Sequence, residues 1–167
     1  KGWLRRQCDA INLRVNQPAH RVSHLVVALP PRRTLKLLYA LANGAWVVSE
    51  QWLTDSVAHG GPLPPDDYEL PSTKAARRRR QAGVPGVLAG LHVTLAGKTS
   101  VPREELVRLL RAAGARCTAV PNESGDAALE VRGEAGQRLA VGEAELLDAI
   151  EAGRPLHAET AACGQTT

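Results

Sequence analysis

The sequence contains no Phe and no Met, and only 3% of its residues are aromatic. Leu, Val, Ile and Ala must therefore supply most of any packed core, and a hydrophobic fraction of 44% is sufficient for one. No apolar run approaches the roughly 20 residues that a membrane-spanning helix needs. The first ten residues also lack the apolar region of a secretory signal. With 167 residues, the chain can form one medium domain or two small ones.

Cysteine is also scarce, because the chain has only Cys8, Cys117 and Cys163, which lie far apart. This odd, scattered set lacks the spacing of metal ligands and favours reduced thiols in the cytosol or nucleus. The five histidines form no metal-like cluster in the sequence either. We therefore expect no metal and no cofactor.

The first half of the sequence alternates short apolar runs with helical patterns. Residues 23–29 have the length and composition of a buried strand, and 45–49 those of a second one. A helix is predicted after each strand, and Gly44 and Gly60 are placed to end these helices. Such alternation predicts an α/β unit with a parallel sheet.

The character of the sequence changes after this unit. Residues 71–86 lack a hydrophobic period, are bracketed by Pro and Gly, and contain four consecutive arginines. Strand and helix patterns then restart and end with a predicted helix at 142–153. We therefore predict four segments: a first repeat at 1–72, a linker at 73–86, a second repeat at 87–160 and a tail at 161–167.

The arginine run has three interpretations: a solvated linker, a nuclear-localisation or polyanion-binding patch, or a direct contact with a partner. The net charge of +4 suits an acidic or phosphorylated partner but is too small to indicate nucleic acid by itself. Binding of DNA or another polyanion through the run would be sensitive to salt. The polyanion candidates are Arg77, Arg78, Arg79 and Arg80.

Basic residues also occur at the start of the helix that follows the first strand. The cations Arg33 and Lys36 oppose the helix dipole there, at a cost of about 0.3–1 kcal/mol each. A bound anion would remove this conflict, because it would meet backbone N–H groups and cations together. The alternative is a solvated basic turn in which Thr34 caps the helix.

Two short motifs resemble catalytic sites but lack the necessary context. A nucleotide-binding loop around Gly97 and Lys98 requires a glycine at the position of His92. Ser56, His59 and Asp66 are close in sequence, but no nucleophile-elbow pattern surrounds them. We therefore expect that the protein is not an enzyme.

The residues from 23 to 70 resemble the BRCT family. The resemblance rests on "SHLVV", on Gly44 before Trp46, on Trp52 in the following helix, and on the closing "YEL". Residues 87–160 are similar to a second BRCT repeat, with Glu145 at a position where the family has Trp. The chain is thus similar to a tandem BRCT pair.

This resemblance implies two α/β repeats, each with a parallel four-stranded sheet flanked by helices, packed head to tail. It implies binding of phosphoserine or phosphothreonine peptides and no catalysis. Thr34 and Lys36 match phosphate ligands, Arg33 matches a residue that contacts the peptide main chain, and Leu38 matches a residue that lines a side-chain pocket. The family's first strand, which completes the phosphate site, has no counterpart in the sequence.

Tandem BRCT pairs are commonest in nuclear proteins of the DNA-damage response and the cell cycle, and they resemble the BRCT region of a kinetochore protein. The resemblance therefore implies a nuclear partner that carries a phosphorylated residue, with no membrane involved. The alternative is a scaffold that binds an unmodified protein, with a basic hinge that binds DNA, microtubules or another polyanion.

Overall fold

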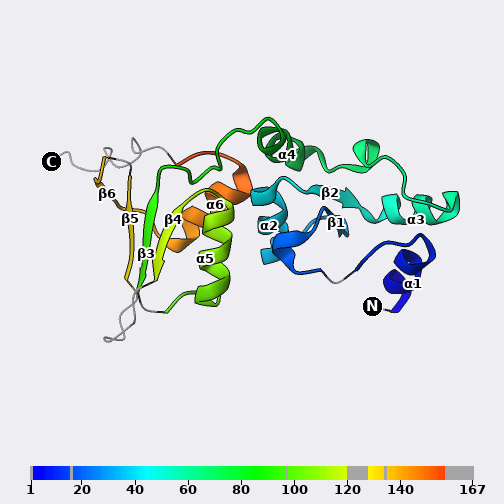
Figure 1. Ribbon diagram of the computed structural model, residues 1–167, viewed down its shortest axis with the longest axis horizontal. Coiled ribbons are helices and arrows are strands. Elements are labelled where there is room, and N and C mark those ends of the chain that lie inside the picture. Colours follow the sequence, from blue (N-terminus) through cyan, green and yellow to red (C-terminus); the bar gives the residue numbers. More distant parts are fainter. Residues whose placement is uncertain (1, 16, 97, 120–127, 134, 157–167) are drawn as a thin grey trace. The chain divides into compact units, whose positions relative to one another are not determined.

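The structure is a computed structural model that describes residues 2–15, 17–96, 98–119, 128–133 and 135–156. The chain divides into two compact units, Lys1–Ala82 and Gly83–Thr167 (Figure 1).

Unit 1 contains two strands and four α-helices among its described residues. They follow the order α1 (Gly2–Ala10), β1 (His24–Val27), α2 (Leu35–Asn43), β2 (Trp46–Ser49), α3 (Glu50–His59) and α4 (Lys74–Gln81). β1 and β2 pair in parallel, with His24 opposite Trp46 and Val27 opposite Ser49. The predicted strands and helices of residues 23–61 are therefore present.

Local sequence signals explain where α2 begins and ends. Thr34 is its N-cap, and Gly44 ends it in the left-handed conformation with φ of 69°. The Gly44 N–H donates to the carbonyl of Leu41, which would otherwise lack a partner at the helix end. Gly60 ends α3 in the same way, with φ of 82°.

The core of unit 1 lies on both faces of its small sheet. Val47 and Val48 are neighbours on β2, so their side chains point to opposite faces. Val47 belongs to a buried cluster with residues of α2, and Val48 to a cluster with residues of α1 and α3. The members of the two clusters are Leu37, Ala40, Leu41, Ala45, Val47 and Leu70, and Cys8, Ile11, Val48, Trp52 and Leu53.

The predicted linker at 73–86 needs correction, because residues 74–81 form helix α4, which packs against α2. Arg77 occupies the buried face of α4, where a hydrophobic residue would be expected. The other three arginines lie in the last turn, where positive charge is favourable to the helix dipole. The arginine run therefore forms part of a folded helix in unit 1.

Unit 2 contains a four-stranded sheet and two α-helices among its described residues. They are β3 (His92–Ala96), α5 (Arg103–Ala112), β4 (Arg116–Ala119), β5 (Ala128–Arg132), β6 (Arg138–Leu139) and α6 (Glu143–Ala152). The strand order is β4-β3-β5-β6. β3 and β4 are parallel, whereas β5 is antiparallel to both of its neighbours.

The α/β class is as predicted, but the sheets differ from the expected parallel four-stranded sheet in each repeat. In its described residues, unit 1 has two paired strands, and unit 2 has a mixed sheet. β5 and β6 are separated by only five residues, and a parallel connection requires a much longer crossover. Head-to-tail packing of the repeats stays a prediction.

The core of unit 2 is aliphatic. Val93 and Leu95 of β3 and Val131 of β5 are fully buried, and α5 and α6 lie on one side of the sheet (Figure 1). The helices bury side chains of the same kind, namely Leu106, Leu109, Leu110, Leu146 and Ile150. Alternate residues of the strands therefore point to the opposite face of the sheet.

Candidate functional site

The start of α2 presents three exposed polar side chains, those of Arg33, Thr34 and Lys36. Thr34 has an extended backbone, and its Oγ1 accepts a hydrogen bond of 3.3 Å from the backbone N–H of Leu37. Its carbonyl oxygen accepts the N–H of Leu38 at 3.0 Å. Thr34 therefore caps the helix, as the alternative interpretation of this region predicts.

Capping by Thr34 still leaves groups that can bind an anion. A threonine hydroxyl that accepts one hydrogen bond retains its own proton, which it can donate. The first N–H groups of a helix have no acceptor within the helix, and Thr34 uses only that of Leu37. The N–H groups of Leu35 and Lys36 therefore remain oriented toward the space before the helix.

The surrounding sequence makes this helix start electropositive. No Asp or Glu occurs between Asp9 and Glu50, a segment with five Lys and Arg residues. The first turn of α2 has no acidic residue either. This gap in acidic residues is readable from the sequence, and the sequence analysis missed it. It strengthens the case for an anion at this position.

Leu38 lies within α2 and is buried, with 3% of its surface exposed. Arg33 and Lys36 are exposed, so a ligand can reach them. The structure thus brings Arg33, Thr34 and Lys36 together at one helix start and places Leu38 inside the fold. The peptide-binding roles of all four stay predictions.

Arg77 differs from the other three polyanion candidates, because its side chain is buried and bound to Glu69. Its Nε and NH2 groups donate to the two carboxylate oxygens of Glu69 at 2.7 and 2.8 Å, and both side chains are almost fully buried. The hydrogen bond to Glu69 also raises the pKa of Arg77. Arg78 and Arg80 are exposed, and Arg79 is partly exposed. A polyanion can therefore reach these three, whereas Arg77 is engaged inside unit 1.

Arg77 also completes a stack of flat side chains that the sequence analysis did not foresee. Its guanidinium lies 3.5 Å from the ring centroid of Trp46. The His24 ring is parallel to Trp46 at 6.4 Å and to Trp52 at 5.1 Å. Burial lowers the pKa of His24. The neutral imidazole therefore suits this packing.

Trp52 is buried, with 3% of its surface exposed, and its indole N–H donates to the carbonyl of Leu63 at 2.8 Å. Trp52 therefore lies in the core of unit 1. Trp46 is only half-buried and lies between His24 and Arg77. The two tryptophans therefore act as packing residues of unit 1.

The described segments contain two free cysteines, Cys8 and Cys117. Those segments hold no group of three or more His, Cys, Asp or Glu side chains that could bind a metal ion. Burial raises the pKa of Cys8 and of Cys117, which disfavours the reactive thiolate form. Cys163 lies outside the described residues. No helix in the described segments is both long and apolar enough to cross a membrane.

Comparison with known proteins identifies the family. The family model of the BRCA1 C Terminus (BRCT) domain matches residues 8–57, which run from α1 to α3. Residues 8–57 of the first unit therefore match the BRCT family, whose members are in general non-enzymatic protein-interaction modules.

A solved structure shows that the likeness of fold extends over a larger part of the chain. The chain is similar to the crystal structure of the BRCT5-BRCT6 domains of Brc1 from S. pombe, with a TM-score of 0.54 and 20% sequence identity. The similar region covers 69% of this chain and 59% of that chain. The resemblance to the BRCT family is thus confirmed, and the neighbouring fold is that of a tandem pair.

Proposed function

We propose that this chain is a non-enzymatic module that binds a phosphoserine or phosphothreonine peptide through the start of α2. The BRCT match over residues 8–57 carries the proposal, because this segment includes Arg33, Thr34 and Lys36. The phosphorylated partner would be a nuclear protein of the DNA-damage response, the cell cycle or the kinetochore.

The chemistry at the helix start supports a phosphate ligand. A phosphate dianion would accept hydrogen bonds from the Thr34 hydroxyl and from the N–H groups of Leu35 and Lys36. The Lys36 ammonium would add a charge-assisted bond that an unphosphorylated serine cannot recruit. The absence of acidic residues from 10 to 49 would keep the local potential favourable to the dianion.

Substitution of Lys36 tests the proposal. Lys36→Glu should abolish the preference for the phosphorylated member of a matched peptide library. Lys36→Met should cost about 1.5–3 kcal/mol of binding free energy, the usual scale for a hydrogen bond to a charged group. Lys74→Met is the matched control, since Lys74 lies in the same unit on α4. Affinities for phosphorylated and unphosphorylated peptides can be compared by fluorescence anisotropy.

Arg33→Ala distinguishes the two kinds of contact within this site. A contact with the peptide main chain does not depend on the phosphate, so this variant should weaken binding of both peptide forms by similar factors. Equal affinity of the unmodified protein for the two peptide forms would refute the phosphate site. A loss of affinity in Lys74→Met as large as that in Lys36→Met would refute the role of Lys36.

A second function is favoured by the exposed arginines at the end of α4. Unit 1 holds 13 Lys and Arg against 6 Asp and Glu, a net charge of +7, so it can bind DNA, microtubules or another polyanion. The Arg78→Ser/Arg79→Ser/Arg80→Ser variant should weaken polyanion binding at low salt and leave phosphopeptide affinity within about twofold. Arg77 is kept in this test because its replacement would disturb the fold. Unchanged DNA binding in the triple variant would exclude this function.

A further inference from the structure

The sheet of unit 2 carries a row of four basic side chains, one from each strand. Arg116 of β4 lies opposite His92 of β3, His92 lies opposite Arg132 of β5, and Arg132 lies opposite Arg138 of β6. Neighbouring strands are about 4.8 Å apart, so the row spans about 14 Å. The sequence hides this row, because its members are separated by up to 46 positions.

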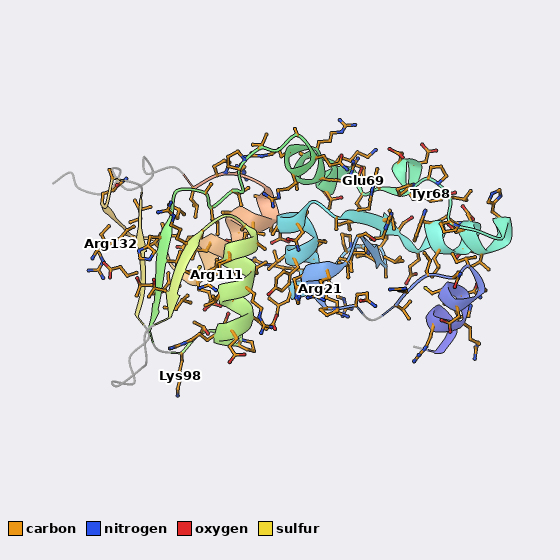
Figure 2. All side chains as sticks on the ribbon, in the orientation of Figure 1. Arg21, Tyr68, Glu69, Lys98, Arg111 and Arg132 are labelled. Atoms are coloured by element: carbon orange, nitrogen blue, oxygen red, sulfur yellow. The ribbon has the colours of Figure 1, made fainter. Side chains whose placement is uncertain are left out.

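All four residues are exposed and lie on the face of the sheet opposite to α5 and α6. The buried neighbours Val93 and Val131 point toward the helices, so His92 and Arg132 must point away from them. Figure 2 shows Arg132 on this outer side. No helix of the described residues in unit 2 covers this face.

The described acidic residues of unit 2 lie mostly on its two helices. Unit 2 as a whole is acidic, with 8 Lys and Arg against 11 Asp and Glu, a net charge of −3. All of its described acidic residues except Glu130 lie on α5 and α6. The outer face of the sheet is therefore a basic surface on an acidic unit.

Among the described residues, the basic row is only partly neutralised. Glu130 Oε1 lies 2.8 Å from Arg132 and 3.8 Å from Arg138. One carboxylate thus faces two guanidinium groups that lie directly opposite each other, an arrangement that is destabilising for like charges. Arg116 forms no ion pair with a described residue. An external anion would relieve this excess of positive charge.

We propose that the outer face of the unit 2 sheet is a docking surface for a short acidic peptide segment. The segment would lie across the strands, with its carboxylates on Arg116, Arg132 and Arg138. An extended peptide places side chains of one face about 6.6–7 Å apart, so two or three carboxylates match the length of the row. Thr94, in the adjoining row, supplies a hydroxyl group for a further hydrogen bond, and the hydroxyl of Thr118 lies 3.0 Å from Nε2 of His92.

The same observations favour an acidic peptide over nucleic acid. Unit 2 contains no Phe, Trp or Tyr on which bases could stack. A long polyanion would also meet the net negative charge of the unit, whereas a short peptide meets only the basic face. This surface is independent of the start of α2, so the proposal does not rest on the phosphopeptide function.

The test uses the full chain and a fluorescein-labelled peptide of alternating Glu and Ser. Its controls are the matching Gln–Ser peptide and single-stranded and duplex DNA. The Arg116→Gln/Arg132→Gln/Arg138→Gln variant should bind the acidic peptide at least about fivefold more weakly, the combined scale of three exposed ion pairs. Lys98→Gln/Arg108→Gln/Arg154→Gln removes the same charge from other parts of unit 2 and should change affinity by less than about twofold. Melting curves check that both variants fold.

A single substitution should change the affinity for the acidic peptide in the opposite direction. Glu130→Gln removes the competing carboxylate and should tighten binding of the acidic peptide; unchanged or weaker binding would contradict the proposal. Equal losses in the two triple variants, or no binding of the acidic peptide by the unmodified chain, would overturn it. Loss of DNA binding in the Arg116/Arg132/Arg138 variant, without binding of the acidic peptide, would assign the face to nucleic acid instead. Lys36→Glu should leave acidic-peptide binding intact, which separates this test from that of the phosphate site.

Discussion

The two units of this chain reach their folds with different residues. Unit 1 contains every Trp and Tyr of the protein, is basic, and stacks Trp46, Trp52, His24 and Arg77 around a two-stranded sheet. Unit 2 contains no aromatic Phe, Trp or Tyr, is acidic overall, and packs aliphatic side chains beneath a four-stranded sheet. Flat rings and a buried ion pair stabilise the first unit, and branched aliphatic chains stabilise the second.

This difference concerns the segment that the family model matches, residues 8–57 of unit 1. The match ends at Val57, and the Trp-bearing helix α3 lies at its end. In unit 2, the position expected for that Trp holds Glu145, which is exposed and accepts the backbone N–H of Gly142 at 2.9 Å. Glu145 thus stabilises the start of α6 and contributes nothing to the core. Leu146, Leu147 and Ile150 bury the inner face of α6.

The largest expected effect is a loss of stability that is confined to one of the two units. Trp52→Ala should reduce the free energy of unfolding of unit 1 by about 3–5 kcal/mol, because it opens a large cavity. Leu95→Ala should reduce that of unit 2 by about 2–5 kcal/mol. Tryptophan fluorescence reports on unit 1 alone, since all three Trp lie there, and far-UV circular dichroism reports on both. Identical shifts of both signals in both variants would show that the units unfold as one.

The next largest effect on stability is expected at the buried ion pair between Arg77 and Glu69 in unit 1. Arg77→Met leaves the Glu69 carboxylate buried without its partner and should cost about 3 kcal/mol. Adding Glu69→Gln should recover much of this loss, because no charge then remains buried. Arg78→Met, one position along and exposed, is the control and should change stability by less than about 0.5 kcal/mol. Chemical denaturation followed by fluorescence measures all three, and equal losses in Arg77→Met and Arg78→Met would contradict the burial of Arg77.

Two glycines of unit 1 allow a finer comparison. Gly44 has φ of 69°, and an added Cβ would lie 2.5 Å from Cβ of Arg80, whereas Gly60 has φ of 82° and open space around it. Gly60→Ala should cost about 1 kcal/mol for the backbone conformation alone. Gly44→Ala should cost more, about 1–3 kcal/mol, because α4 must also shift. Equal costs in thermal unfolding would show that α4 does not pack on the end of α2.

The smallest effect concerns pH. Burial lowers the pKa of His24 below its usual value near 6.5, so the unfolded chain binds a proton more readily than the folded one. The free energy of unfolding of unit 1 should therefore be fully retained above about pH 6.5 and fall as the pH drops below it. His24→Gln should flatten this dependence in fluorescence-detected melting. A slope that persists unchanged in the variant would assign the pH dependence to another group.

The sequence predicts the elements of unit 1 well where its signals are local. The apolar runs before and after α2 and the two glycines that end α2 and α3 suffice to place β1, β2 and both helices. α4 was missed because its buried position holds Arg77, which a hydrophobic pattern counts as a surface residue. Its partners Glu69 and Trp46 lie 8 and 31 positions away, so no local pattern reveals the pair.

The sequence led to a candidate site at the start of α2 because two cations at a helix N-terminus are unusual, and the binding role of these residues stays a prediction. The capping bond of Thr34 and the stacking of His24 depend on conformation and on a neighbouring element, so the sequence alone could not establish them. The mixed sheet of unit 2 could not be foreseen either, because hydrophobic runs predict strands but not their direction.

The packing of α4 determines where this chain can be divided. A fragment that ended at residue 72, the boundary that composition suggests, would remove Arg77 and leave Glu69 and the face of Trp46 without the side chain that covers them. A fragment that ended at Ala82 would retain the helix together with its partners. Trypsin should accordingly spare the arginine-rich helix despite its many sites, and a protease of broad specificity should cut the segment after Gln81, where the helix ends and Gly83 and Pro85 follow.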